Sequence, residues 1–392
     1  MIAPARATSL DAYRGFVMFL MLAEVLQLPR VAKQFPESGF WRTVLFQTTH
    51  VEWRGCSLHD LIQPSFSFLV GAALAFSVAK RREGGQSLGR ASLHAAWRSF
   101  ALIALGIVLR SVNRPQTNFT FEDTLTQIGL GYFPLFLLAW ARRTNPAWHA
   151  LSIALILLAY WGVFVVYEAD GPASIVREPA SWPHHLSGFE AHWVKNDNFA
   201  SGFDEIFLNV FPRPARFTHN RGGYVTLSFV PTLATMLLGL MAGGWLREPR
   251  SEWHKAGMFA LIGAGLLFVG WAFDAAGVCP VVKRIWTPSW VLFSGGWCFL
   301  LLALFHAATD AVGTRGWSYP LRVIGANSIL IYCVAEVPIA AFLMATVKTH
   351  LGPKAFQLFG MEAEPVVAGA TVLAIYWLGL WWLYAKRVFV RI

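Results

Sequence analysis

The side chains best suited to chemistry gather between residues 50 and 60, where the chain reads His-Val-Glu-Trp-Arg-Gly-Cys-Ser-Leu-His-Asp. An imidazole can remove a proton as a general base, or carry an acyl group as a nucleophile. A carboxylate beside it can orient the ring and stabilise its protonated form. We therefore take His50 and Asp60 as candidate catalytic residues. The structural alternatives are an ordinary loop histidine at position 50 and a helix-capping carboxylate at position 60.

The same stretch offers metal-ligand atoms at His50, His59 and Asp60. Their spacing matches no closed zinc pattern, and no CxxC or HxxEH motif accompanies them. The sequence therefore predicts no metal site. It also lacks a G-x-S-x-G elbow, a P-loop and a GxGxxG fingerprint, so neither a hydrolase triad nor a standard nucleotide-binding loop has support.

Three further ionisable residues, Asp11, Arg14 and Glu24, lie in or beside the first apolar segment. An ionisable group within a membrane span costs a few kcal/mol, so each is a candidate for a functional site. Asp11 and Arg14 are three residues apart and can pair on one helix face, which makes an interfacial ion pair the alternative. Glu24 follows Arg14 by ten residues, about 15 Å along a helix, and has no cation close in the sequence. We predict that Glu24 joins His50 and Asp60 in the site. The alternatives are a neutral buried acid and a partner of another helix.

The elements that must position these residues are membrane helices. The 392 residues are 56% hydrophobic and only 14% charged, with a mean hydropathy of +0.48. A chain of this composition belongs in a bilayer. The sequence predicts an all-α, polytopic membrane protein with about ten spans, near residues 13–28, 61–79, 97–112, 125–141, 150–167, 224–245, 257–276, 290–308, 324–345 and 366–384.

The distribution of charge predicts the orientation. With the N-terminus in the cytoplasm, the inner segments hold sixteen Lys and Arg and the short outer loops hold nine, which favours cytoplasmic termini. The net charge of +10 is spread along the chain and forms no basic stripe, so nucleic acid is not an expected partner. We expect one domain over residues 1–392, with a long, aromatic-rich extracytoplasmic loop at about 168–223 that has a function of its own.

Six segments of the chain are together similar to segments of one known family. The first reads Ser-Leu-Asp-Ala-Tyr-Arg-Gly and begins at Ser9, and the second is residues 50–60. The others are Pro64 to Gly71, Pro231 to Gly243, Lys283 to Ser289 and Arg322 to Ser328. With these segments the chain resembles the membrane acyltransferases related to heparan-alpha-glucosaminide N-acetyltransferase.

The resemblance implies transfer of an acetyl or other acyl group from cytoplasmic acyl-CoA to an amino sugar or related glycan on the other side of a bacterial inner (plasma) membrane. The family's key histidine corresponds to His50 and its aspartate to Asp60. Animal members carry an Asn near the end of the first helix, where this chain has Glu24.

Acetyl-CoA acts as a co-substrate in this scheme, and its diphosphate requires cations and helix N-termini. We expect Arg14, Asn327 and Ser328 to contribute to its binding. For these three residues the alternatives are an interfacial anchor and a helix-packing polar pair.

Two other functions remain open at this stage. A secondary transporter of a small polar solute also carries buried acids and arginines in its spans, but we see no inverted repeat in the sequence. A structural membrane protein leaves the cluster at residues 50–60 unexplained. The sequence leaves open whether the chain forms a homo-oligomer and whether Cys56 and Cys279 form a disulfide, because spacing alone cannot fix the distance between two cysteines.

Overall fold

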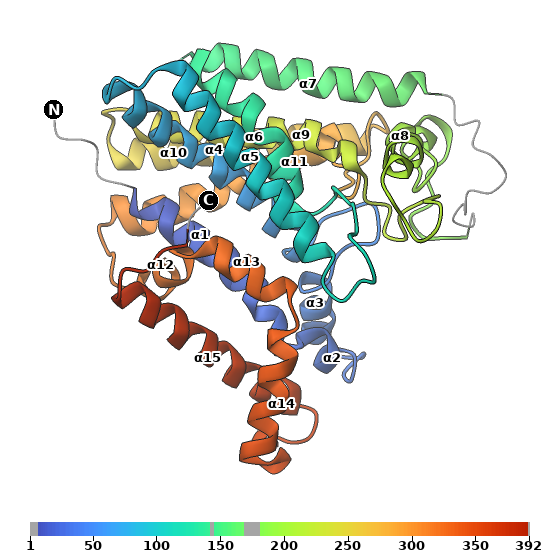
Figure 1. The fold of residues 1–392 in the computed structure, drawn as a ribbon, viewed down its shortest axis with the longest axis vertical. Helices are drawn as coiled ribbons and strands as arrows, with labels where there is room; N and C mark the ends of the chain where they lie inside the picture. Colours follow the sequence, from blue (N-terminus) through green and yellow to red (C-terminus); the bar gives the residue numbers. More distant parts are fainter. Residues whose placement is uncertain (1–6, 142–144, 168–180, 391–392) are drawn as a thin grey trace. The chain divides into compact units, whose positions relative to one another are not determined.

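The computed structural model describes residues 7–141, 145–167 and 181–390, and every regular element within these ranges is a helix (Figure 1). By their contacts the described residues fall into two compact units that alternate along the sequence. Unit 1 contains residues 52–56 and 63–303, and unit 2 contains residues 7–51, 57–62 and 304–390. Eight helices are long and apolar enough to cross a bilayer, which confirms the all-α, polytopic prediction.

Seven of these eight helices lie wholly or mainly in unit 1. They are α4 (Ile62–Glu83), α5 (Leu88–Arg110), α6 (Thr124–Ala141), α7 (Pro146–Val166), α9 (Phe229–Leu246), α10 (Glu252–Ala275) and α11 (Pro288–His306). In the most apolar windows of α4 and α9, 67% of residues are buried, against 22% in α5 and α10. The first pair therefore forms the interior of the unit, whereas α5 and α10 present apolar side chains for lipid.

Glycines set the distance between α4 and α9. A Cβ atom on Gly239 of α9 would lie 1.8 Å from the carbonyl oxygen of Phe68 in α4. A Cβ atom on Gly71 of α4 would lie equally close, at 1.8 Å, to the carbonyl oxygen of Met236. Small residues at such crossings let two membrane helices approach backbone to backbone, which fixes their register.

Unit 2 contains α1 (Thr8–Leu22), α2 (Leu28–Ala32), α3 (Gly39–Gln47), α12 (Tyr319–Gly325), α13 (Ser328–Glu336), α14 (Ile339–Leu351) and α15 (Glu364–Ala385). Here too glycines bring helices together. A Cβ atom on Gly15 of α1 would lie 1.8 Å from the carbonyl oxygen of Leu321 in α12. A Cβ atom on Gly369 of α15 would lie 2.2 Å from the carbonyl oxygen of Val25. Helix α15 therefore packs closely against the 3-10 turn that carries Glu24.

Two predicted spans differ from the structure. The first is a helix of only 15 residues, α1, followed by a 3-10 turn over Ala23–Leu26. The helix path ends there because Gln27 adopts a left-handed conformation, with φ of 51°, and Pro29 follows it. Helix α1 is therefore shorter than the roughly 20 residues that cross a bilayer at 1.5 Å per residue.

The predicted span at residues 324–345 is wrong as a single helix. It is split into α12, α13 and α14, and α13 and α14 meet at an angle of 73°. The break falls at Val337 and Pro338, because proline disfavours helical geometry in the residue before it and has no N–H to donate. Val337 is accordingly extended, with φ of −107° and ψ of 155°. Counting the bent pair as one span brings the described total to nine.

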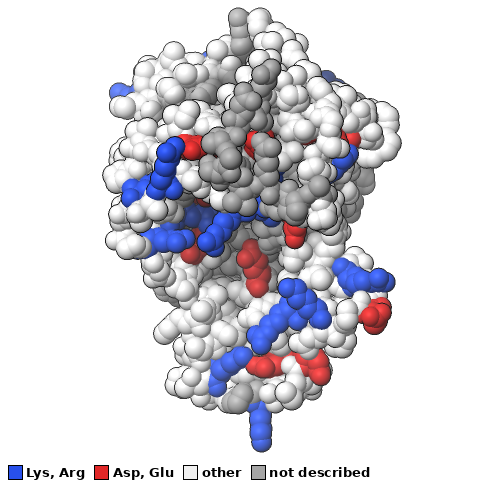
Figure 2. All heavy atoms as spheres, turned by 90° about the vertical axis from the view of Figure 1, so that its right-hand side faces the viewer, with Lys and Arg blue, Asp and Glu red and all other residues white. Residues whose placement is uncertain are grey.

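Charged side chains are sparse on the molecule. On the face drawn in Figure 2 they gather in a few groups, and broad areas carry no Lys, Arg, Asp or Glu. This pattern agrees with the 14% of charged residues in the sequence and with a surface that largely faces lipid.

The predicted outer loop has regular structure in its described part. Residues 168–180 lie outside the described ranges, and the remainder contains a 3-10 helix at Gly188–Trp193 and α8 at Phe199–Phe207. Trp193 is fully buried, and its carbonyl oxygen accepts a hydrogen bond of 3.0 Å from the indole nitrogen of Trp53. The aromatic side chains of this loop therefore form part of a packed core in unit 1.

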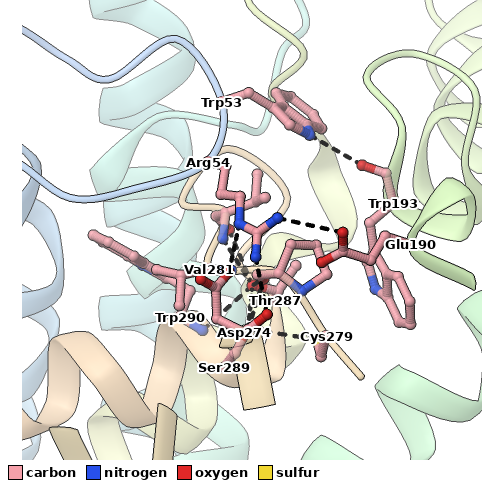
Figure 3. Close-up of polar contacts among 12 residues, drawn as sticks. Trp53, Arg54, Glu190, Trp193, Asp274, Cys279, Val281, Thr287, Ser289 and Trp290 are labelled. Atoms are coloured by element: carbon pink, nitrogen blue, oxygen red, sulfur yellow. Dashed lines mark hydrogen bonds and ion pairs between the residues drawn. The ribbon is translucent and has the colours of Figure 1, made fainter. Parts of the chain in front are cut away.

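Arg54 joins three segments of unit 1 (Figure 3). Its guanidinium donates to Asp274 Oδ1 at 3.0 Å, to the Asp274 carbonyl oxygen at 2.9 Å and to Glu190 Oε2 at 3.3 Å. The backbone of Arg54 also forms an isolated antiparallel bridge with Val282. Residues 52–56 are thereby fixed to the end of α10, to the connection that follows it and to the outer loop.

A buried carboxylate ties α8 to the segment before α9. Asp204 Oδ2 accepts a hydrogen bond of 2.9 Å from the backbone N–H of Thr226. Burial raises the pKa of Asp204 to about 7; the Thr226 N–H opposes this rise, and nearby Glu122 adds to it. No local pattern in the sequence indicates this contact, since its two residues are 22 positions apart.

Candidate active site

Asp60 is held by an unusually dense set of donors. Its Oδ2 accepts hydrogen bonds from the backbone N–H of Val51 at 3.1 Å, from the backbone N–H of Ser57 at 3.2 Å and from Ser57 Oγ at 3.0 Å. The side chain is only 2% exposed. A buried carboxylate surrounded by donors is fixed in position.

This arrangement combines the helix cap that residue 60 suggested with a role in the loop. Asp60 lies inside a 3-10 turn, His59–Leu61, just before α4. Its Oδ2 accepts from the Ser57 N–H, and its own backbone N–H donates to Ser57 Oγ at 3.3 Å, which is the reciprocal pattern of a capping box. The carboxylate also accepts from the Val51 N–H, so the same side chain organises the helix start and the loop before it.

His50 uses the remaining oxygen of this carboxylate. Its Nδ1 lies 2.8 Å from Asp60 Oδ1, and its side chain is 41% exposed. A carboxylate can only accept, so in the neutral ring Nδ1 carries the proton and Nε2 carries the lone pair. The structure thus brings His50 and Asp60 together as the sequence predicted, with a buried anion behind a partly exposed imidazole.

Local bonds close the loop that carries His50. Helix α3 ends at Gln47, whose side-chain oxygen accepts a hydrogen bond of 2.8 Å from the backbone N–H of Leu58. Ser57 Oγ also donates to the carbonyl oxygen of Thr49 at 2.7 Å. Between these contacts the chain reverses at Gly55, whose φ of 126° is a conformation that favours glycine. Residues 50 and 60 therefore meet although ten positions separate them.

Glu24 reaches the same group of residues through His59. The two side chains are 3.6 Å apart, from His59 Nε2 to Glu24 Oε1. The His59 and His50 rings lie against each other, with centroids 4.4 Å apart. The cluster therefore contains two imidazoles and two carboxylates, all within unit 2. From the sequence, His59 was a candidate only as a metal ligand, and no local pattern indicates its contact with Glu24.

The three residues expected to bind CoA lie elsewhere in unit 2. Arg14 donates to Asp11 Oδ1 at 2.7 Å and to the Gly325 carbonyl oxygen at 2.7 Å. Ser328 Oγ donates to that same carbonyl oxygen at 2.9 Å, so Arg14 and Ser328 meet there. Arg14 precedes Glu24 by ten residues, which places this group about 15 Å from the His50 cluster along the helix axis.

Asn327 has a clear packing role. Its side-chain nitrogen donates to the Val388 carbonyl oxygen at 3.1 Å, and its oxygen accepts from the Val390 N–H at 2.8 Å. The side chain is fully buried. Asn327 therefore holds the chain segment that follows α15 against the start of α13.

A further polar group near the start of α1 was missed. Asp310 Oδ2 accepts a hydrogen bond from the Ser9 N–H at 3.0 Å and lies 3.4 Å from His306 Nδ1. His306 is buried, and it is four residues before Asp310 in one helical stretch. The i, i+4 spacing could have revealed the pair, but the predicted span stopped at residue 308.

Two further kinds of site were considered, a metal site and a disulfide. In the part of the chain that the structure describes, no three His, Cys, Asp or Glu side chains gather as a metal site. Cys279 is a thiol, not half of a disulfide, and it accepts a hydrogen bond of 3.4 Å from Ser289 Oγ (Figure 3).

Comparison with known proteins identifies relatives of the chain. No family model matches it. It is 24% identical over 376 residues to heparan-alpha-glucosaminide N-acetyltransferase of Homo sapiens, and 21% identical over 372 residues to the protein of the same name from Mus musculus. Each match covers 85% of this chain and 53% of the relative, so the chain spans about half the length of the curated relatives it matches. The chain is therefore related to this family of acetyltransferases.

Proposed function

We propose that the chain is a transmembrane acyltransferase that moves an acetyl or related acyl group from cytoplasmic acyl-CoA to an amino sugar or similar glycan on the extracytoplasmic side. The observation that carries the proposal is the His50–Asp60 pair, in which a fixed, buried carboxylate orients a partly exposed imidazole. The relation to two proteins named N-acetyltransferases supports the same reaction class.

In this reaction His50 acts on the acyl carbon or on the acceptor proton through Nε2. Asp60 keeps the proton on Nδ1 and stabilises the positive charge that develops on the ring. Four contacts hold the carboxylate, so little reorganisation accompanies that charge. Glu24 contributes negative charge at the edge of the cluster through His59.

We also propose that Arg14, Ser328 and Asn327 shape the binding region for CoA. Arg14 can offer a charged planar group to a phosphate, and its contacts to Asp11 and Gly325 fix its direction. Ser328 supports the same carbonyl oxygen as Arg14. Asn327 acts indirectly, because its amide is engaged with the segment after α15.

The proposed topology places both termini and the 80–98 connection in the cytoplasm of a bacterial cell, with the 168–223 loop outside the inner membrane. A cysteine introduced at Ser187 tests it, because that residue lies in the described part of the outer loop. We expect a membrane-impermeant thiol reagent to label Ser187→Cys from outside the cell. Labelling only after the cytoplasmic side is exposed would overturn the orientation.

The function itself is tested with the purified chain in liposomes, labelled acetyl-CoA as donor and glucosamine as the acceptor probe. We expect label to appear in N-acetylglucosamine, dependent on the protein. Label that accumulates inside the vesicles with no acetylated product would contradict the proposal and support transport instead. Omission of the acceptor is the matched control.

A further inference from the structure

Beside the His50–Asp60 pair lies a second imidazole–carboxylate pair, His59 and Glu24. The His59 side chain is 14% exposed and the Glu24 side chain is 61% exposed. Their closest nitrogen and oxygen are 3.6 Å apart, beyond ordinary hydrogen-bond distance, and exposed ion pairs contribute only about 0–1 kcal/mol to stability. This contact by itself therefore adds little to the stability of the fold.

The two rings are near enough to serve one substrate. Their centroids are 4.4 Å apart and their planes meet at 49°. The rings come from different elements, because His50 follows α3 whereas His59 begins the 3-10 turn before α4. Asp60 holds the first ring and Glu24 lies beside the second, so each imidazole has its own carboxylate.

We infer that the two pairs divide the reaction, with His50 receiving the acyl group and His59 removing the proton of the acceptor amine. This inference rests on the proposed acyltransferase function and assigns a second base to it. One imidazole cannot do both tasks in the same step. Once an acyl group is bonded to Nε2 of His50, that ring has its other nitrogen against Asp60 and has no lone pair for the amine proton.

In the first step His50 Nε2 bonds to the acyl carbon, the carbon–sulfur bond of the thioester breaks, and CoA leaves as a thiolate. The resulting acyl-imidazolium keeps its Nδ1 proton, and the Asp60 carboxylate 2.8 Å away stabilises its charge.

In the second step the amine nitrogen bonds to the acyl carbon, and the bond from that carbon to His50 breaks. The electron pair returns to Nε2, and the amine proton passes to the His59 ring. Glu24 stabilises the new imidazolium and, being 61% exposed, gives the proton a way to water.

The test separates the two half-reactions in the purified chain. Release of CoA thiol without acceptor measures the first, and transfer from labelled acetyl-CoA to glucosamine measures the second. We expect wild type to release about one thiol per protein in a burst, and His59→Ala to keep that burst while transfer falls by about 10²- to 10⁴-fold. Added imidazole should restore part of the transfer rate in His59→Ala, which a purely structural role would not allow.

Two further variants test the charge of Glu24 and provide a control histidine. Glu24→Gln keeps the shape of the side chain and removes its charge, so transfer should fall by about tenfold with the burst unchanged. His350→Gln changes an exposed histidine of α14 and should behave as wild type. Wild-type transfer in folded His59→Ala, loss of the burst in that variant, or absence of a burst in wild type would each overturn the inference. Absence of any transfer by wild type would overturn the acyltransferase function itself.

Discussion

Replacement of Asp60 by asparagine tests how the carboxylate controls His50. Three donors, from Val51 and Ser57, converge on Oδ2, so the amide oxygen of the new side chain will occupy that position. Its NH2 group must then face His50 Nδ1, where the carboxylate oxygen was. An NH2 group donates, so the ring proton will move from Nδ1 to Nε2 and the reactive lone pair will be lost.

The magnitude follows from these contacts. Hydrogen bonds to a charged acceptor are worth about 1 kcal/mol more than those to a neutral one, so weakening three of them costs about 1–3 kcal/mol after the gain from removing a buried charge. A change of tautomer in a base held by a carboxylate costs activity on the order of 10²- to 10⁴-fold. Asp60→Asn should therefore stay folded and lose nearly all transfer.

The assay measures initial rates of acetyl transfer beside thermal unfolding in the same detergent. Ser57→Ala is the matched control, because it removes one donor to Asp60 and the bond to Thr49 but leaves the His50 contact. We expect Ser57→Ala to lose about 1–2 kcal/mol of stability and less than tenfold in rate. Wild-type turnover in Asp60→Asn, or equal losses in the two variants, would refute the tautomer argument.

Two further predictions concern unit 1. Because the pKa of Asp204 is raised from its ordinary value to about 7, the folded state holds a proton that the unfolded state releases, so stability should fall as pH rises from about 4 to about 7 and Asp204→Asn should flatten this slope in thermal unfolding. Gly239→Ala places a Cβ atom 1.8 Å from the Phe68 carbonyl oxygen, and we expect a loss of about 3 kcal/mol or more, measured by the melting temperature or the folded yield.

Each of these predictions has a neighbouring control. Glu205, next to Asp204, pairs with exposed Arg216, so Glu205→Gln should keep the wild-type dependence on pH. Gly244 has open space at its Cβ position, so Gly244→Ala should be tolerated. An unchanged pH slope in Asp204→Asn, or a wild-type melting temperature in Gly239→Ala, would show that the corresponding contact does not matter for stability.

The features that could be predicted from the sequence are those that depend on a local pattern of residues. Apolar windows located the long helices because burial in lipid requires about 20 apolar residues in a row. The break at Pro338 was missed because the window there is apolar enough on average to read as one span, although Glu336 and the proline were both visible in the sequence. The first span was expected to be short, but its bounds of 13–28 miss the start of α1 at Thr8 and the turn at Gln27, because average apolar composition does not record a left-handed residue.

The candidate site also contains contacts that could be predicted from the sequence and contacts that could not. His50 and Asp60 could be paired from their chemistry, and the structure brings them within 2.8 Å. The contact of His59 with Glu24 crosses 35 positions and depends on how α1 ends, which no local pattern records. The engagement of Asn327 by Val388 spans 61 positions, so a residue expected to bind a ligand has a packing role that the sequence did not reveal.

Turnover by His50→Ala in liposomes, measured with labelled acetyl-CoA and glucosamine, tests most directly whether His50 carries out the acyl transfer. The side chain is 41% exposed, so its removal leaves no buried cavity and should barely change the melting temperature or the binding of acetyl-CoA. We expect transfer to fall by at least about 10²-fold in this folded variant. Wild-type turnover by folded His50→Ala would contradict it.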